Sequence, residues 1–147
     1  MLKVGSKAPE FALEDAKQQT HSLSQALGKT VVLYFYPRDN TPGCTQQACD
    51  FRDQLESLNA QNTVIFGISR DSARSHANFQ AKHDLNFTLL SDPELIAHQS
   101  YHALKEQDKT VRSTFLIDKT GKIIKIWPKV SVKGHVAEVL EAIEQLT

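Results

Sequence analysis

Six consecutive apolar residues, Val31 to Tyr36, form the most constraining segment of this chain, because Pro37 follows them directly. A continuous run of β-branched and aromatic residues, without polar alternation, predicts a strand that is buried on both faces. Proline cannot donate a hydrogen bond to a sheet, so we expect the strand to end at Pro37. The run therefore predicts a central strand that leads directly into the segment after it.

That next segment places a cysteine at the start of a helix. Cys44 follows the tripeptide Thr-Pro-Gly, and apolar residues then recur at spacings of three and four, which predicts one amphipathic helix with its apolar stripe on the sheet. The residues of the stripe are Ala48, Phe51, Leu55 and Leu58. Unpaired backbone N–H groups and the helix dipole favour an anion in a first helical turn. We therefore expect Cys44 to react as a thiolate.

The remaining sequence alternates between strand and helix patterns. It predicts a strand at 64–69, a helix from 71 or 72 to about 84, a strand at 87–90, a helix that starts at 92–93, a β-hairpin of 114–117 and 123–127, and a last helix over 136–146. This order predicts an α/β fold with a central mixed sheet flanked by helices on both faces. We find no linker, repeat or low-complexity segment, so residues 1–147 are expected to form a single domain.

Charge and composition argue against several classes of partner. Lys plus Arg and Asp plus Glu number 17 each, and there is no basic run, so neither nucleic acid nor a membrane surface is an expected partner. Residues 1–9 lack the apolar core of a signal peptide, and no stretch is long and apolar enough to cross a bilayer. We therefore expect a cytoplasmic protein, in which two close cysteines are more often catalytic, redox-sensing or metal-binding than a structural disulfide.

The five-residue spacing of the two cysteines has a mechanical consequence. On an ideal helix, Cys44 and Cys49 would be separated by about 140° of rotation, with Cα atoms about 8 to 9 Å apart. Disulfides require Cα atoms within about 7 Å, so the two thiols could pair only if this part of the helix unwinds. Two helical cysteines can also be inert packing residues, and the spacing alone leaves both interpretations open.

The residues around the thiol resemble a known family. Pro37, Thr41 and Cys44 match the Pro-x-x-x-Thr-x-x-Cys signature of peroxiredoxins. The segment Thr-Pro-Gly-Cys-Thr, with Cys49 five residues after Cys44, resembles the subgroup called peroxiredoxin Q or bacterioferritin comigratory protein. The likeness covers nearly the whole chain, including residues 4–11, 34–37, 111–118 and 134–135. It implies a thioredoxin-like fold and a monomeric thiol peroxidase that needs no cofactor or metal and that reduces hydrogen peroxide and organic hydroperoxides.

The resemblance also implies a role for each of five residues. Cys44 would attack the peroxide and become a sulfenic acid, and Cys49 would condense with it to an intramolecular disulfide, which thioredoxin or a similar dithiol protein would reduce. Thr41 would hydrogen-bond the thiolate and the peroxide, and Pro37 would shield the thiol from water. Arg112 would stabilise the charge that moves between the oxygens. From the residues alone, Thr41 is more simply a turn or cap residue, Pro37 is equally a strand end, and Arg112 is one arginine among several.

Other interpretations remain beside the peroxidase. In one, the protein is a non-catalytic redox sensor in which oxidation unwinds the helix and alters a partner surface. A general disulfide reductase is disfavoured because the chain has no Cys-x-x-Cys motif. His98 and His102 have a spacing that can bind a metal, but we expect them to be exposed helix histidines. One departure from the family pattern is Gln47, where many relatives carry a glutamate, and it bears on the charge near Cys44.

Overall fold

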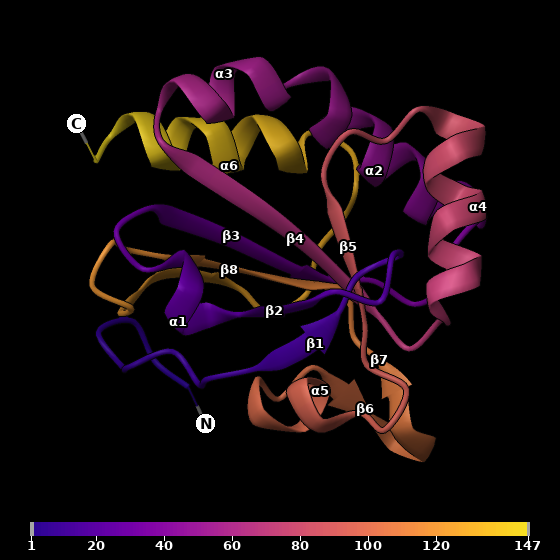
Figure 1. The fold of residues 1–147 in the computed structure, drawn as a ribbon. Coiled ribbons are helices and arrows are strands. Elements are labelled where there is room, and N and C mark those ends of the chain that lie inside the picture. Colours follow the sequence, from indigo (N-terminus) through magenta and orange to yellow (C-terminus); the bar gives the residue numbers. More distant parts are fainter. Residues whose placement is uncertain (1, 147) are drawn as a thin grey trace.

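The computed structural model describes residues 2–146, which fold around a seven-stranded mixed sheet (Figure 1). In spatial order its strands are β2 (Thr20–Ser22), β1 (Ala12–Glu14), β5 (Thr88–Ser91), β4 (Thr63–Ser69), β3 (Thr30–Phe35), β8 (Ser113–Ile117) and β9 (Ile123–Trp127). The pairs β3–β4 and β4–β5 are parallel, and the other neighbours are antiparallel. The mixed sheet predicted from the sequence is therefore confirmed.

Strand β3 occupies the middle of the sheet, which explains its uninterrupted apolar sequence. It pairs with β4 on one edge and with β8 on the other, and all six of its residues are buried. Val32 and Tyr34 contribute to one hydrophobic cluster, whereas Val31 and Leu33 contribute to a second cluster on the opposite face. Because both faces carry a core, neither set of side chains could be polar without burying an unpaired group.

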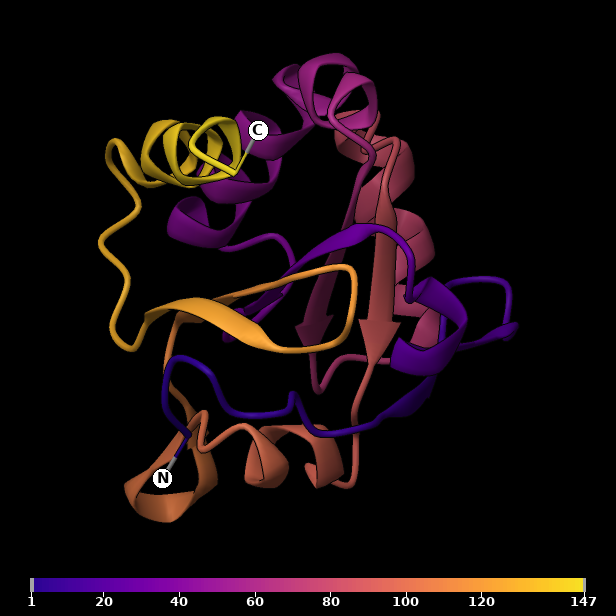
Figure 2. The same cartoon turned by 90° about the vertical axis from the view of Figure 1, so that its left-hand side faces the viewer.

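Helices cover both faces of the sheet, but unequally (Figures 1 and 2). The first face carries α2 (Pro42–Asp53), α3 (Leu55–Ala60), α4 (Ala73–His83) and α6 (His135–Glu144). The opposite face carries the short helices α1 (Leu23–Ala26) and α5 (Ile96–Ser100) and the N-terminal segment. Helices on both faces were predicted and are confirmed. No helix within residues 2–146 is long and apolar enough to cross a membrane.

The helix that begins before Cys44 is shorter than its apolar stripe predicted. It ends at Asp53, and Gln54, with φ and ψ of −108° and 8°, separates α2 from α3. Phe51 before the break and Leu58 after it are both fully buried in the same cluster. The break therefore interrupts the helix without removing its apolar side chains from the core.

The helix predicted at Asp92 and Pro93 begins instead at Ile96, because these two residues form a turn before it. The Asp92 carboxylate does cap the helix, since it accepts the backbone N–H groups of Ile96 at 3.0 Å and His98 at 2.8 Å. The sequence did not predict α1, β1 or β2, nor the excursion of β6 (Leu104–Lys105), the 3₁₀ turn η1 (Glu106–Asp108) and β7 (Lys109–Thr110). These elements are two to four residues long, too short to show a period.

A glycine on β4 allows close packing beneath α2. A Cβ atom on Gly67 would lie 2.8 Å from ring atoms of Tyr34 and 2.9 Å from Leu89, which is closer than side chains tolerate. Tyr34 in turn stacks on Phe51 of α2, with ring centroids 4.8 Å apart. Any larger residue at position 67 would therefore push Tyr34 towards the helix that carries both cysteines.

Candidate active site

Cys44 lies at the start of α2, where the chain emerges from the end of β3. It is the third residue of the helix and only 2% exposed, after Thr41 at the N-cap position and Pro42 at the first helical position. The N–H groups of a first helical turn have no partners within the helix. The thiol is therefore shielded from bulk water and lies at the positive end of the helix dipole.

Arg112 contacts this thiol although it lies far from Cys44 in the sequence. It precedes β8, and its Nη2 donates a hydrogen bond to the Cys44 sulfur at 3.3 Å. A guanidinium is permanently charged and donates in fixed directions, so this contact favours the thiolate form of Cys44. Of the several arginines that the sequence offered, the structure brings Arg112 to the thiol.

Gln47 orients that guanidinium. Its side chain is 0% exposed, and its Oε1 accepts a hydrogen bond from Arg112 Nη1 at 2.7 Å. The arginine thus directs one nitrogen at the amide and the other at the sulfur. A neutral amide leaves the positive charge of Arg112 unopposed, whereas a glutamate would pair with it. Gln47 Nε2 is buried and has no hydrogen-bond partner among the described residues.

Gly43 provides the space for Arg112 at the helix start. A Cβ atom there would lie 3.2 Å from Arg112 Nη2, tighter than nearly all real contacts of that kind. Gly43 does not have a positive φ, so its backbone does not require glycine. The absence of a side chain at this position therefore serves the approach of the guanidinium.

The structure places Thr41 and Pro37 in the loop between β3 and α2. The Thr41 hydroxyl donates its proton to the Arg38 carbonyl oxygen at 2.9 Å, which closes the turn before the helix. Since that proton is engaged, the Thr41 oxygen can offer only its lone pairs to a neighbouring group. Pro37 is exposed at the bend where the loop begins.

Cys49 lies on the same helix as Cys44, as the sequence predicted. Both thiols are free, Cys49 is half-buried, and α2 is continuous from Pro42 to Asp53. The helix is held firmly just after Cys49, because Phe51 is fully buried and Arg52 donates to the His83 carbonyl oxygen at 2.7 Å. In this conformation a continuous helix separates the two sulfurs.

Sequence reasoning missed a buried polar cluster at the start of the loop. The Asp39 carboxylate is surrounded by side chains from α4 and from the residue just after β3, and the group consists of Tyr36, Asp39, Ser75 and His76. Some 36 residues separate the two halves of this cluster, so no local pattern predicts it. The one local signal was the presence of Asp39 in the loop between β3 and α2, a position that also suits an ordinary turn residue.

A second buried cluster lies behind Arg112, and it corrects the prediction for His98. This residue is fully buried: its Nδ1 lies 2.7 Å from Asp92 Oδ2 and its Nε2 lies 2.9 Å from Thr110 Oγ1. His102 is exposed, as expected. The spacing of the two histidines gave no warning, because α5 is only five residues long and the partner of His98 precedes the helix.

A third histidine, the first residue of α6, contacts the strand that follows Arg112. His135 Nε2 lies 2.8 Å from the Thr114 hydroxyl, at the point where α6 meets β8. Burial, with a smaller contribution from the charge of Arg112, lowers the pKa of His135 to about 4. His135 is therefore neutral near pH 7 and adds no charge to the site.

Both the sequence and the fold of this chain are similar to those of known proteins. Residues 4–126 match the model of the AhpC/TSA family. The chain is 45% identical to Peroxiredoxin Bcp of Bacillus subtilis, over 99% of this chain and 98% of that protein. Among solved structures it is similar to a mutant of PrxQ from Xylella fastidiosa, with a TM-score of 0.94 and 33% identity over 99% and 97% of the two chains. It is also similar to the Xanthomonas campestris bacterioferritin comigratory protein, a structure concerned with alkyl peroxide reduction, with a TM-score of 0.89 and 34% identity over 92% and 90%. These likenesses confirm the expected thioredoxin-like fold.

Proposed function

This chain belongs to the AhpC/TSA family of peroxiredoxins, among those of the Bcp and peroxiredoxin Q type, and we propose that it reduces hydrogen peroxide and organic hydroperoxides through Cys44. Its relatives are peroxiredoxins, which supports thiol peroxidase activity. The observation that carries the assignment of Cys44 is its contact with Arg112 at the positive end of α2.

In the proposed first step, the Cys44 thiolate attacks the terminal oxygen of the peroxide. The S–O bond forms as the O–O bond breaks, so sulfur is oxidised to the sulfenic acid and the peroxide is reduced to water or an alcohol after the leaving oxygen takes a proton. Arg112 stabilises the negative charge as it moves from sulfur to the leaving oxygen. Thr41 accepts the hydrogen bond of the peroxide O–H, because its own proton is engaged with Arg38. Pro37, at the start of the loop between β3 and α2, helps to direct that loop over the thiol.

In the proposed second step, Cys49 resolves the oxidised Cys44. The Cys49 sulfur attacks the sulfenic sulfur, a disulfide forms, and water leaves. Because both residues lie on one continuous helix, α2 has to unwind around them before the sulfurs can meet. An external dithiol protein such as thioredoxin then reduces the disulfide, and the helix reforms. The three reacting groups, Cys44, Arg112 and Cys49, belong to one chain, so we propose that the monomer is active.

The proposal is tested by peroxide consumption with thioredoxin, thioredoxin reductase and NADPH. The wild type should oxidise NADPH continuously. Cys44→Ser should consume no peroxide above background, and Cys49→Ser should show a single turnover that ends at the sulfenic acid. Gln46→Ala, an exposed position on the same helix, serves as the control that should behave as wild type. Sustained turnover by Cys44→Ser would refute the assignment.

A redox sensor is the second candidate, favoured by the same placement of two cysteines on one helix. Oxidation would then change the surface around α2 without repeated turnover. The same experiment separates the two functions. A disulfide that forms on addition of peroxide but is not turned over by thioredoxin or by a small dithiol such as dithiothreitol would support the sensor.

A further inference from the structure

The carboxylate of Asp39 is the most heavily bonded group in the loop before Cys44. Asp39 is 5% exposed, and its two oxygens accept hydrogen bonds from Tyr36 Oη at 2.6 Å, Ser75 Oγ at 2.8 Å and His76 Nδ1 at 2.7 Å. Its backbone N–H donates to the Asp71 carboxylate at 2.7 Å. The start of the loop is therefore attached to the end of β3 and to the first turn of α4 at once.

His76 is held at both ring nitrogens by groups that only accept. Nδ1 faces the Asp39 carboxylate, and Nε2 lies 3.1 Å from the Leu90 carbonyl oxygen. Through these two contacts His76 links the Asp39 carboxylate to a backbone oxygen of β5. Within 2–146 the Tyr36 hydroxyl is the other ionisable group in contact with His76, at 3.4 Å, and burial followed by the charge of Asp39 raises its pKa, which keeps it neutral.

Only a short stretch of chain separates this cluster from the thiol. Asn40, with φ of 60°, and Thr41, whose hydroxyl closes the turn on Arg38, connect Asp39 to α2. The side-chain partners of Asp39 come from α4 and from Tyr36, which directly follows β3, so they need not move when α2 unwinds. On the far side of the cysteines, Phe51 and Arg52 hold the helix to the core and to α4. The stretch that can unwind is thereby confined to about residues 40–50.

We infer that Asp39 and His76 are positioning residues that hold the first turn of α2 folded around Cys44 and so set the partition of its sulfenic acid between the disulfide and further oxidation. The inference rests on the proposed function. Neither side chain has a described contact with the sulfur, so they act through the loop. While the loop is held, Cys44 meets peroxide in the folded site, where a second peroxide can oxidise the sulfenic acid to the sulfinic acid. A loosened loop lets the helix unwind sooner and favours Cys49.

The test compares Asp39→Asn with wild type by rapid quenching and intact-mass spectrometry, which separates disulfide from sulfinic acid. Asp39→Asn should react with hydrogen peroxide about 10-fold more slowly, because the thiol is less well placed. It should also need several-fold more peroxide to become half sulfinic. Tyr36→Phe removes one hydrogen bond to Asp39 and keeps the ring, so it should shift both quantities in the same direction by less, and it provides a milder variant if Asp39→Asn does not fold.

His21→Asn is the control, because it breaks another Asp–His pair, with 2.8 Å between His21 Nε2 and Asp15 Oδ2, whose histidine lies on β2 and away from the loop. It should not change the peroxide dose for half sulfinic acid. The inference is overturned if Asp39→Asn and Tyr36→Phe keep the wild-type dose, or shift it no more than His21→Asn does. If the wild type itself forms neither sulfenic acid nor disulfide, the proposed function fails as well.

Discussion

Two buried Asp–His pairs support the two arms of the site, and they differ in what each histidine contacts with its second ring nitrogen. We call residues 37–53, which carry Cys44, the helix arm, and residues 110–117, which begin just before Arg112, the strand arm. In both pairs an Asp oxygen lies 2.7 Å from Nδ1 of a fully buried histidine. His76 supports the helix arm and His98, through Thr110, supports the strand arm.

The second partner of each histidine distinguishes the pairs. His76 Nε2 faces a carbonyl oxygen, which only accepts, whereas His98 Nε2 faces a hydroxyl, which can donate or accept. Burial acts to raise the pKa of Asp92, but hydrogen bonds from His98 and from backbone N–H groups together lower it. The helix arm is thus tied through His76 to a backbone oxygen of β5, whereas the strand arm is tied through a side chain of its own, Thr110. In the proposed cycle the helix arm unwinds beyond Asp39, and the strand arm stays in place.

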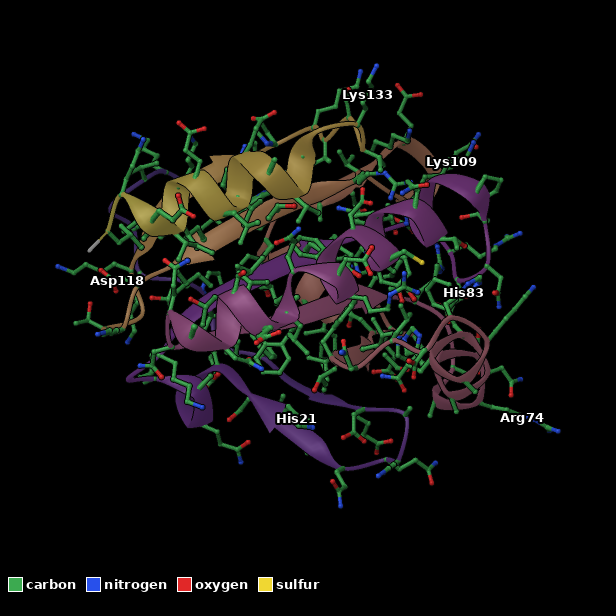
Figure 3. All side chains as sticks on the ribbon, turned by 90° about the horizontal axis from the view of Figure 1, so that it is seen from above. His21, Arg74, His83, Lys109, Asp118 and Lys133 are labelled. Atoms are coloured by element: carbon green, nitrogen blue, oxygen red, sulfur yellow. The ribbon has the colours of Figure 1, made fainter. Side chains whose placement is uncertain are left out.

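The prediction with the largest expected effect concerns Arg112, the residue by which the strand arm contacts the thiol. Arg112→Met removes the charge beside the thiolate and the donor for the leaving oxygen, so the rate constant for hydrogen peroxide should fall about 10³-fold, or about 4 kcal/mol. Stopped-flow measurement of sulfenic acid formation checks this. Arg74, which projects into solvent from α4 in Figure 3, gives the control Arg74→Met, which should react as wild type. A loss below about 10-fold for Arg112→Met would contradict the role of the guanidinium.

The support of the strand arm is broken at His98. His98→Asn leaves the Asp92 carboxylate buried with one partner fewer, so the free energy of unfolding should fall by about 3 kcal/mol. Urea denaturation measures the change. His102→Asn, at an exposed position after the same helix, should change stability by less than about 0.5 kcal/mol. Equal losses in the two variants would show that the buried pair contributes nothing particular.

The free energy of unfolding should fall in mild acid, before the carboxylates titrate, because of His135, which contacts the strand arm at Thr114. His135 is neutral in the folded protein down to about pH 4, whereas an unfolded histidine takes up a proton near pH 6.5. The unfolded chain therefore binds more protons in this window, and stability should fall as the pH drops from 6.5 to 4, by at most about 3 kcal/mol. Urea midpoints at pH 7 and pH 4.5 measure it. His135→Gln should show a shallower dependence, and an unchanged slope would contradict the effect.

The prediction with the smallest expected effect tests the contact between Gly43 of the helix arm and Arg112 of the strand arm. Gly43→Ala places a methyl group 3.2 Å from Arg112 Nη2 and should displace the guanidinium by a few tenths of an ångström. The rate with peroxide should fall about 10-fold, or about 1.4 kcal/mol. Stability should stay level or rise by about 0.5 kcal/mol, because alanine favours a helix over glycine. A variant that loses stability and keeps its rate would reverse this prediction.

The sequence predicted those features that depend on a local pattern. The apolar run before Pro37, the stripe after Cys44 and the hairpin around Gly121 can each be recognised within a short segment, and each was found close to its predicted place. The helix at Asp92 was displaced because the carboxylate caps it across a turn. A pattern that spans a few residues cannot report such a contact.

The site residues likewise fall into those that a local pattern predicts and those that it does not. The motif identified Cys44 from neighbouring residues, and only the family resemblance could select Arg112, which is 68 positions away. The clusters around Asp39 and Asp92 had no local signature, because each histidine owes its burial to elements brought together by the sheet. For the same reason His98 looked like a surface residue in the sequence.

The continuity of α2 also has a consequence for redox thermodynamics. In the proposed cycle the dithiol form keeps the helix intact and the disulfide form does not, so the folding free energy of that helical stretch enters the reduction potential of the cysteine pair. For a two-electron couple, each kcal/mol of helix stability makes the disulfide about 20 mV more oxidising. Refolding of the helix therefore favours reduction of the disulfide. Residues that stabilise α2 also make the protein easier for its reductant to reduce.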